Sequence, residues 1–341
     1  MMTMRDAMTA LREVRCPEDL FGAGATDPES RRAGHRVYLR LAAALHPDRV
    51  PAAQAMAATD AFVRLGRLYR GWLAAASVSE AFEVVGAHGR YRLGAAHARG
   101  SVADVFRAEP DVIVKLARRP LANRLLAGER TALTDIAAWA TGHSWPAPYF
   151  PRLLDAVDHT DSAAGDVRAI NVLNSLTDGF VTLAQVRAAH PDGVDPRDYA
   201  WMHRRLLRFL AGAAAAQWVH TAVTAENVLV HPRLHGVVLI GWSFATRPGR
   251  PAAATRTTID YPPEIGEAVS PRTDVYLAHR LMLTMLGARA PAPMRAFAEG
   301  CLQPAARLRS EAHTLLDEFD DLLDRMYGRR RFRPFHLPEG Q

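Results

Sequence analysis

The pattern of apolar and polar positions divides the chain into a helical first part and a mixed second part. Apolar residues recur every three or four positions over residues 30–45 and roughly 52–75, which predicts two amphipathic helices. From Phe82 the pattern changes to short runs rich in β-branched residues. These runs predict strands over 91–94, 103–108 and 112–116 and a hairpin over 150–156 and 168–173, and a long helix over 196–218 then begins a mainly helical last part.

The first amphipathic helix carries one basic stripe. Arg32, Arg36 and Arg40 recur every four residues, so they lie on one face, while an apolar stripe lies on another. The tripeptide His46-Pro47-Asp48 ends this helix, because proline disfavours a helical residue before it.

Two helices joined by His-Pro-Asp, with a basic stripe on the first, resemble the J-domain of DnaJ-type co-chaperones over about residues 15–75. The resemblance implies that Asp48, with His46, Pro47 and the arginine stripe, docks on a DnaK-type chaperone and accelerates its ATP hydrolysis. The alternative is a helical hairpin that only packs against the next domain. The Gly/Phe-rich linker and the zinc-binding cysteines of full-length DnaJ proteins are absent, so recognition of a client protein would come from the remaining residues.

The chain contains one lysine, Lys115, and every other residue among its 42 Lys+Arg is arginine. Lys115 is in the middle of the predicted strand Val112–Leu116. An ammonium is a compact point charge that suits a narrow site holding a phosphate or a single carboxylate. Glu129 follows in a helical pattern that could bring its carboxylate back to this strand. The alternative is a lysine whose stem packs along a sheet edge while its ammonium stays in water.

A strand lysine followed by a helix glutamate resembles the ion pair in the small lobe of protein kinases. The loop around Gly100, between the two preceding strands, resembles a kinase phosphate loop in which two of the three glycines are missing. The resemblance makes Gly100, Lys115 and Glu129, together with Asn227 further on, the candidate nucleotide-binding residues.

Residues 219–230 resemble the catalytic loop of kinases, with His220 and Asn227 in place but Ala222 at the position of the catalytic aspartate. Gly241-Trp242-Ser243 stands where the family has its metal-binding Asp-Phe-Gly, so Gly241 replaces the aspartate. Glu226 is the one carboxylate between Asp198 and Asp260. Phosphoryl transfer depends on magnesium, which needs oxygen ligands, and on a general base that is typically worth roughly 10²–10⁴-fold in rate. We therefore predict no catalytic residues and no metal site.

The positions that organise the kinase scaffold are present. Residues 261–264, Tyr-Pro-Pro-Glu, resemble the Ala-Pro-Glu that closes the activation segment, and Asp274 resembles the aspartate that organises the large lobe. The resemblance implies that Arg307 pairs with Glu264, and it gives His220 a structural role.

The composition, with 49% hydrophobic and 23% charged residues, is ordinary for a soluble globular protein, and the longest apolar stretch is too short to cross a bilayer. We therefore expect a cytoplasmic protein. Cys16 and Cys301 lie far apart and form no disulfide or metal pattern. The net charge of +6 would allow an acidic partner, and the densest basic cluster runs from Arg329 to Arg333. Because most other arginines alternate with acids on helices, the sequence does not favour nucleic acid as a partner.

Together these patterns predict a multidomain α+β protein. A J-domain-like helical domain (1–78) precedes a bilobal kinase-like fold, with a β-rich small lobe (79–175), a mostly α-helical large lobe (176–328) and a basic tail (329–341). The predicted function is an inactive kinase-like adaptor for an unknown client or partner, fused to a chaperone-recruiting J-domain. The alternative is a nucleotide-binding or active atypical kinase that uses Lys115, Glu129, Asn227 and Glu226, with ATP bound without magnesium as the one cofactor considered.

Overall fold

The computed structural model describes residues 4–14, 17–22, 28–46, 50–51, 54–76, 82–143, 150–160, 165–329 and 331–337. The chain forms two compact units, which we describe separately. The first comprises Met1–Val84, Tyr91–Ala98 and Phe106–Pro110, and the second comprises Val85–Arg90, Arg99–Val105 and Asp111–Gln341.

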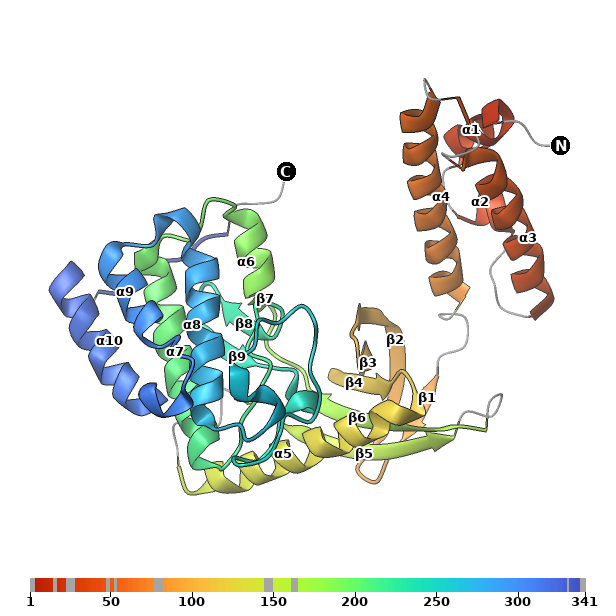
Figure 1. Ribbon diagram of the computed structural model, residues 1–341. Helices are drawn as coiled ribbons and strands as arrows, with labels where there is room; N and C mark the ends of the chain where they lie inside the picture. Colours follow the sequence, from red (N-terminus) through yellow and green to blue (C-terminus); the bar gives the residue numbers. More distant parts are fainter. Residues whose placement is uncertain are drawn as a thin grey trace. The chain divides into compact units, whose positions relative to one another are not determined.

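Helices make up most of the first unit. They are α1 (Met4–Glu13), α2 (Glu18–Phe21), α3 (Pro28–Leu45) and α4 (Ala55–Ala76) (Figure 1). The two long amphipathic helices predicted from the sequence are thus confirmed as α3 and α4. Their apolar faces meet in a core that includes the fully buried Leu45, Leu65 and Trp72. A Cβ at Gly34 would lie 2.2 Å from the Trp72 ring, so this close approach needs glycine on α3.

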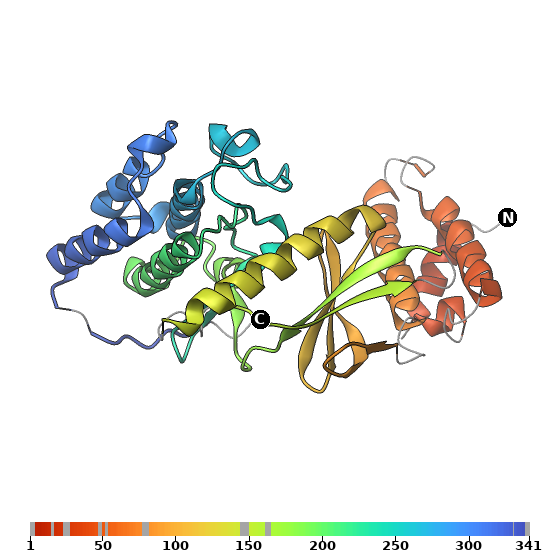
Figure 2. The same ribbon diagram turned by 90° about the horizontal axis from the view of Figure 1, so that it is seen from below.

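A six-stranded sheet has the order β1-β2-β3-β4-β6-β5. Its strands are β1 (Glu83–Val85), β2 (Arg90–Arg99), β3 (Ala103–Glu109), β4 (Val112–Ala117), β5 (Leu153–Thr160) and β6 (Val167–Asn174). Strand β6 pairs antiparallel with both β4 and β5, which confirms the predicted hairpin, and its register sets Asn171 opposite Lys115. The long helix α5 (Asn123–Thr141), yellow in Figure 2, runs along β5 and β6 and carries Glu129 on its buried side.

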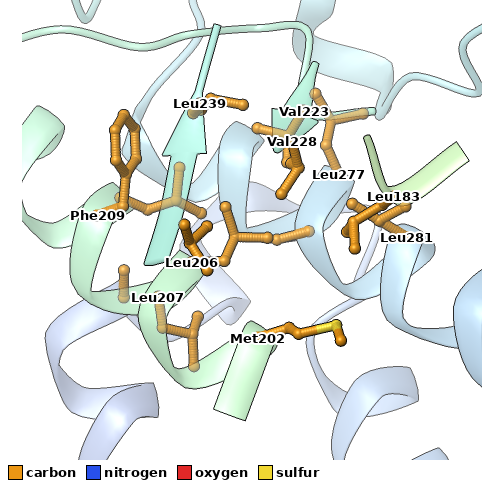
Figure 3. Close-up of a cluster of buried hydrophobic side chains, with 14 of the residues drawn as sticks. Leu183, Met202, Leu206, Leu207, Phe209, Val223, Val228, Leu239, Leu277 and Leu281 are labelled. Atoms are coloured by element: carbon orange, nitrogen blue, oxygen red, sulfur yellow. The ribbon is translucent and has the colours of Figure 1, made fainter. Parts of the chain in front are cut away.

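The remainder of the second unit is mainly helical. It contains α6 (Leu183–Ala189), α7 (Pro196–Ala215), α8 (Pro271–Leu286), α9 (Ala292–Gly300), α10 (Ala312–Tyr327) and a three-stranded sheet of β7 (Val181–Thr182), β8 (Val228–His231) and β9 (Gly236–Leu239). Short 3-10 turns are η3 (Pro120–Ala122), η5 (Trp242–Phe244), η6 (Pro263–Gly266), η7 (Gly287–Arg289) and η8 (Ala306–Leu308). Figure 3 shows side chains of this core, among them Leu206 and Phe209 of α7, Leu239 of β9 and Leu277 of α8.

Local capping explains where α7 begins, and backbone geometry explains where it ends. The Asp195 side chain accepts a hydrogen bond from the Arg197 amide, and Pro196 occupies the first helical turn. The helix ends at Ala215, three residues before the predicted end. Gln217 adopts a left-handed φ of 61°, and Val219 then forms a β-bridge with Thr246.

Residues 331–337, which the sequence sets apart as part of a tail, pack within the second unit. Phe335 is buried and belongs to its main apolar core. Among the described residues, no helix combines the length and apolar character needed to cross a bilayer. Cys301 is a buried free thiol, and Cys16 lies outside the described residues.

Candidate functional site

Lys115 and Glu129 form a buried ion pair. The Nζ of Lys115, on β4, donates a hydrogen bond to Oε1 of Glu129, on α5, at 2.5 Å. The side chain of Lys115 is 12% exposed and that of Glu129 is 1% exposed. Each charge stabilises the other, because burying either ion without its partner would cost several kcal/mol or more of free energy.

Asn171 satisfies the other oxygen of this glutamate. Its Nδ2 donates to Oε2 of Glu129 at 3.0 Å and to the carbonyl of Leu126 at 3.0 Å. Its Oδ1 accepts from Nε of Arg130 at 2.6 Å. Asn171 was not among the residues predicted from the sequence, although a lone amide within the apolar run of β6 is a signal for a buried polar partner.

Lys115 also reaches the turn η5. Its Nζ donates to Oγ of Ser243 at 3.2 Å, so one ammonium links β4, α5 and η5. A second link between α5 and the chain after η5 is an ion pair of Asp135 with Arg247. The Arg247 guanidinium also lies 4.2 Å from the ring centre of Trp218.

His220 is a buried, neutral imidazole. Its Nε2 donates to the Ile240 carbonyl at 3.0 Å, which assigns Nδ1 as the acceptor for the Ala222 amide at 3.2 Å. Burial lowers the pKa of His220 to about 3, the Ile240 carbonyl opposes this shift, and the charge of Lys115 lowers the pKa further. The ring packs edge-on against Trp242, with centroids 4.8 Å apart.

Asp274, on α8, holds the backbone at His220. Its two carboxylate oxygens accept from the amides of His220 at 2.6 Å and of Thr221 at 2.8 Å. Thr221 has a φ of 60°, an uncommon conformation for a β-branched residue that these bonds help to hold. Burial raises the pKa of Asp274 to about 7, although the two amide hydrogen bonds act in the opposite direction.

Glu264 pairs with Arg309, so the expected pairing with Arg307 is wrong. The Arg309 guanidinium donates to both carboxylate oxygens of Glu264, at 2.6 and 3.1 Å, and is fully buried. Arg307 is exposed on η8. The Arg309 guanidinium also donates to the carbonyls of Gln303, Arg272 and Pro304, and it lies over the Tyr276 ring. Burial alone would raise the pKa of Glu264, but the hydrogen bonds from Arg309 and Thr273 bring that pKa below its ordinary value.

Asn227 and Gly241 lie in direct contact. The Nδ2 of Asn227 donates to the Ala222 carbonyl at 2.9 Å. Gly241 has a φ of 86°, and a Cβ built on it would lie 2.7 Å from Cγ and Oδ1 of Asn227. A side chain at position 241 would therefore require both a left-handed backbone and a displaced Asn227.

The fold of this chain is similar to that of a solved structure. No protein-family model matches the chain, and a search of curated proteins finds no match. The structure of vaccinia related kinase 3 aligns with a TM-score of 0.55 and 18% sequence identity, covering 72% of this chain and 91% of that one. The chain has a protein-kinase-like fold. At this identity the likeness concerns the fold alone.

Within the kinase-like fold, the expected site residues separate into two groups. Lys115, Glu129, His220 and Asn227 come together around η5 and the loop before β8, through the contacts described above. Gly100 lies in the turn between β2 and β3, where its amide donates to the Ala103 carbonyl at 2.9 Å. That amide is therefore engaged within the turn, and a Cβ at Gly100 would meet the same carbonyl at 2.9 Å.

Ala222 and Gly241 stand at the two positions where the sequence predicted that kinase carboxylates are missing. Ala222 is fully buried, and Glu226 is exposed. Among the described residues, no group of three or more His, Cys, Asp or Glu side chains is arranged to hold a metal ion.

In the first unit, the structure describes part of the expected chaperone-binding motif. Arg32, Arg36 and Arg40 are all exposed on α3, and His46 is exposed just after its end. Pro47 and Asp48 lie outside the described residues.

Proposed function

We propose that the kinase-like unit is a pseudokinase, a binding module that does not transfer phosphate. The observation that supports this most strongly is the contact between Asn227 and Gly241. The position where kinases carry the metal-binding aspartate has no side chain, and the Asn227 amide fills the adjacent space. With Ala222 at the other carboxylate position, the site lacks both the metal-binding aspartate and the catalytic aspartate on which phosphoryl transfer depends.

The retained ion pair has a structural role in this proposal. Lys115 joins the sheet to α5 and η5, and Asp274 and Arg309 hold the large lobe by buried hydrogen bonds. A scaffold that keeps these contacts presents a constant surface to a client or partner protein. Adaptor activity therefore needs the fold but not the chemistry.

Nucleotide binding without magnesium is the second candidate function for this site. An ammonium has three N–H donors, and among the described residues Lys115 uses two of them, toward Glu129 and Ser243. The remaining donor could bind one phosphate oxygen. This candidate binds nucleotide without a metal ion, so the exposed Glu226 takes no part in it.

A ligand and activity panel on the full-length chain separates these functions. Thermal shift is measured with ATP alone, with ATP and magnesium, and with ATP and manganese, and transfer of the γ-phosphate from labelled ATP is followed in parallel. The pseudokinase proposal expects no transfer under any condition. A shift with ATP that is unchanged by either metal supports the second candidate, and metal-dependent transfer refutes both.

We further propose that the first unit recruits a DnaK-type chaperone through Asp48 and the arginines of α3. Support comes from the length of α3, the packing of α3 against α4, and the exposure of Arg32, Arg36 and Arg40. The stack of Tyr38 on Tyr69, with centroids 4.3 Å apart, joins the two helices.

Chaperone ATP turnover tests this second half of the proposal. Asp48→Asn should abolish stimulation, and Arg36→Glu should weaken it, because an acidic partner surface would meet a reversed charge. Asp60→Asn and Arg67→Glu are charge-matched controls at exposed positions of α4. If Asp48→Asn stimulates turnover as well as the wild type does, the co-chaperone function is wrong.

A further inference from the structure

Three aromatic rings of the second unit form a stack that leads from the core to the surface. Trp201 of α7 is 8% exposed, and its ring stacks on His235 with centroids 4.0 Å apart and planes 4° apart. His235 in turn stacks on Phe332, at 4.6 Å and 27°. His235 lies in the turn between β8 and β9 with a left-handed φ of 53°.

The segment that carries Phe332 is anchored on the large lobe at two neighbouring positions. Phe335 is 3% exposed and stacks on His190, with centroids 5.8 Å apart. The Arg333 guanidinium contacts the carboxylates of Asp198 at 2.7 Å and Asp195 at 3.2 Å. Phe332 therefore lies on a surface that is already ordered, so a ligand would not have to order it.

Despite these anchors, Phe332 itself remains 71% exposed. Leu234, the neighbour of His235 in the chain, is 67% exposed. The exposed arginines Arg233, Arg329 and Arg331 are at most three residues away from His235 or Phe332 in sequence. The surface thus combines a supported aromatic face with guanidinium groups, while the carboxylates beneath it, Asp195 and Asp198, are paired with Arg333.

We propose that this surface binds single-stranded nucleic acid, with a base stacked on the outer face of Phe332 and the backbone phosphates near Arg233, Arg329 and Arg331. A stack of flat rings continues most favourably with another flat ring, and every unpaired base offers one. Guanidinium groups supply the phosphate contacts, which are largely independent of sequence. Charge and composition alone did not favour this partner, and the ring stack is the observation that does.

Fluorescence anisotropy with a labelled oligothymidine of about 12 nucleotides tests the proposal on the full-length chain. Phe332→Ala should weaken binding roughly 5- to 150-fold, the range for losing one stacked base, and Phe332→Trp should restore it. With three arginines at the phosphates, the logarithm of the association constant should fall with the logarithm of salt concentration at a slope of about −2. A duplex of the same length should bind more weakly, because its base faces are already stacked.

Matched controls distinguish a stacking platform from general attraction to anions. Leu121→Ala removes another exposed apolar side chain, 84% exposed on η3, and should leave binding unchanged. Arg119→Ala with Arg124→Ala removes two exposed arginines elsewhere and should have a smaller effect than Arg329→Ala with Arg331→Ala. Thermal unfolding of each variant confirms that the surface substitutions leave the fold intact.

Two results would overturn the proposal. The first is oligothymidine binding that is absent, or that Phe332→Ala does not reduce relative to Leu121→Ala. The second is equally tight binding of an oligoglutamate peptide with the same dependence on Phe332, which would assign the surface to an acidic protein partner instead.

Discussion

The carboxamide of Asn227 lies against the Cα of Gly241, in the space that a side chain at position 241 would need. In the proposed pseudokinase, the loss of the aspartate at position 241 and the conformation of Asn227 therefore belong together. Restoring a carboxylate at that one position would create a steric clash rather than a metal site.

We predict that Gly241→Ala destabilises the protein more than Gly249→Ala. Both glycines have a left-handed φ, of 86° and 78°, but a Cβ at Gly249 would have no atom within 4 Å. Each substitution should cost about 1–2 kcal/mol for the backbone conformation, and Gly241→Ala should cost a further ~1–3 kcal/mol for the clash. Urea unfolding measures both, and combining Gly241→Ala with Asn227→Ala should remove most of the additional loss. Equal losses for the two glycine variants would show that Asn227 does not restrict position 241.

Breaking the ion pair of Lys115 and Glu129 from one side should be strongly destabilising. Lys115→Met leaves the Glu129 carboxylate, 1% exposed, with Asn171 as its remaining side-chain donor among the described residues. The expected loss in the free energy of unfolding is about 3–5 kcal/mol. Lys115→Met with Glu129→Met should lose less, because no buried charge remains.

An exposed ion pair supplies the control for this prediction. Arg92 and Glu109 are 3.8 Å apart, with side chains 65% and 78% exposed, so Arg92→Met should change the free energy of unfolding by less than about 1 kcal/mol. If Lys115→Met behaved like Arg92→Met, the ion pair would not contribute to stability as the structure indicates.

Substituting Arg309 or Arg307 should have very different effects on the free energy of unfolding. Arg309→Ala leaves Glu264 without both guanidinium bonds and should lower the free energy of unfolding by about 3–5 kcal/mol. Arg307→Ala, at an exposed position, should change it by no more than about 0.5 kcal/mol. Arg309→Lys should rescue only part of the loss, because an ammonium cannot form the two parallel bonds. Chemical unfolding of the three variants would contradict this assignment if Arg307→Ala were the damaging change.

A buried histidine pair predicts loss of stability in mild acid. His203 of α7 and His279 of α8 are fully buried, with their Nε2 atoms 3.3 Å apart, and Nδ1 of His279 donates to the Val275 carbonyl at 2.7 Å. Burial lowers the pKa of His279 to about 4, and burial together with the neighbouring His279 lowers the pKa of His203 well below its usual value. The rings of Phe297 and Phe319 pack around the pair and offer no charge to stabilise an imidazolium.

The sign of the effect follows from which state binds protons. Unfolded histidine titrates near pH ~6.5, so below that pH the unfolded chain takes up protons that the folded pair refuses. Stability from His279 is present above pH ~6.5 and falls by about 2 kcal/mol by pH ~5, and the contribution of His203 changes in the same direction. Asp274 changes stability in the opposite direction. Because its pKa in the folded state is about 7, the folded state takes up a proton before the unfolded state does as the pH falls, and this favours folding.

Removing one histidine isolates the contribution of the pair from that of Asp274. In His203→Leu, the slope of the unfolding free energy against pH should decrease by about one proton between pH ~6.5 and ~5. Urea unfolding over a series of pH values gives this slope. An unchanged slope would mean that His203 is protonated in the folded state.

Local patterns were sufficient to predict several elements and part of the site. The spacing of apolar residues predicted α3 and α4, because the face of a helix is set by residues only a few positions apart. Lys115 stood out as the one lysine of the chain, and its pairing with Glu129 over a short sequence distance is confirmed.

The sequence by itself thus determined several helices and strands, among them α3, α4 and the β5–β6 hairpin, and which carboxylates are missing from the two kinase positions. These properties belong to neighbouring residues or to composition. Only the tertiary structure decided that Arg309 rather than Arg307 reaches Glu264, that Asn171 completes the bonding of Glu129, and that Asn227 fills the space at Gly241. The choice between two arginines in one short loop depends on which of them the packing directs inward, toward carbonyls and a ring from other elements. Contacts of this kind join residues that are distant in the chain, so no local pattern records them.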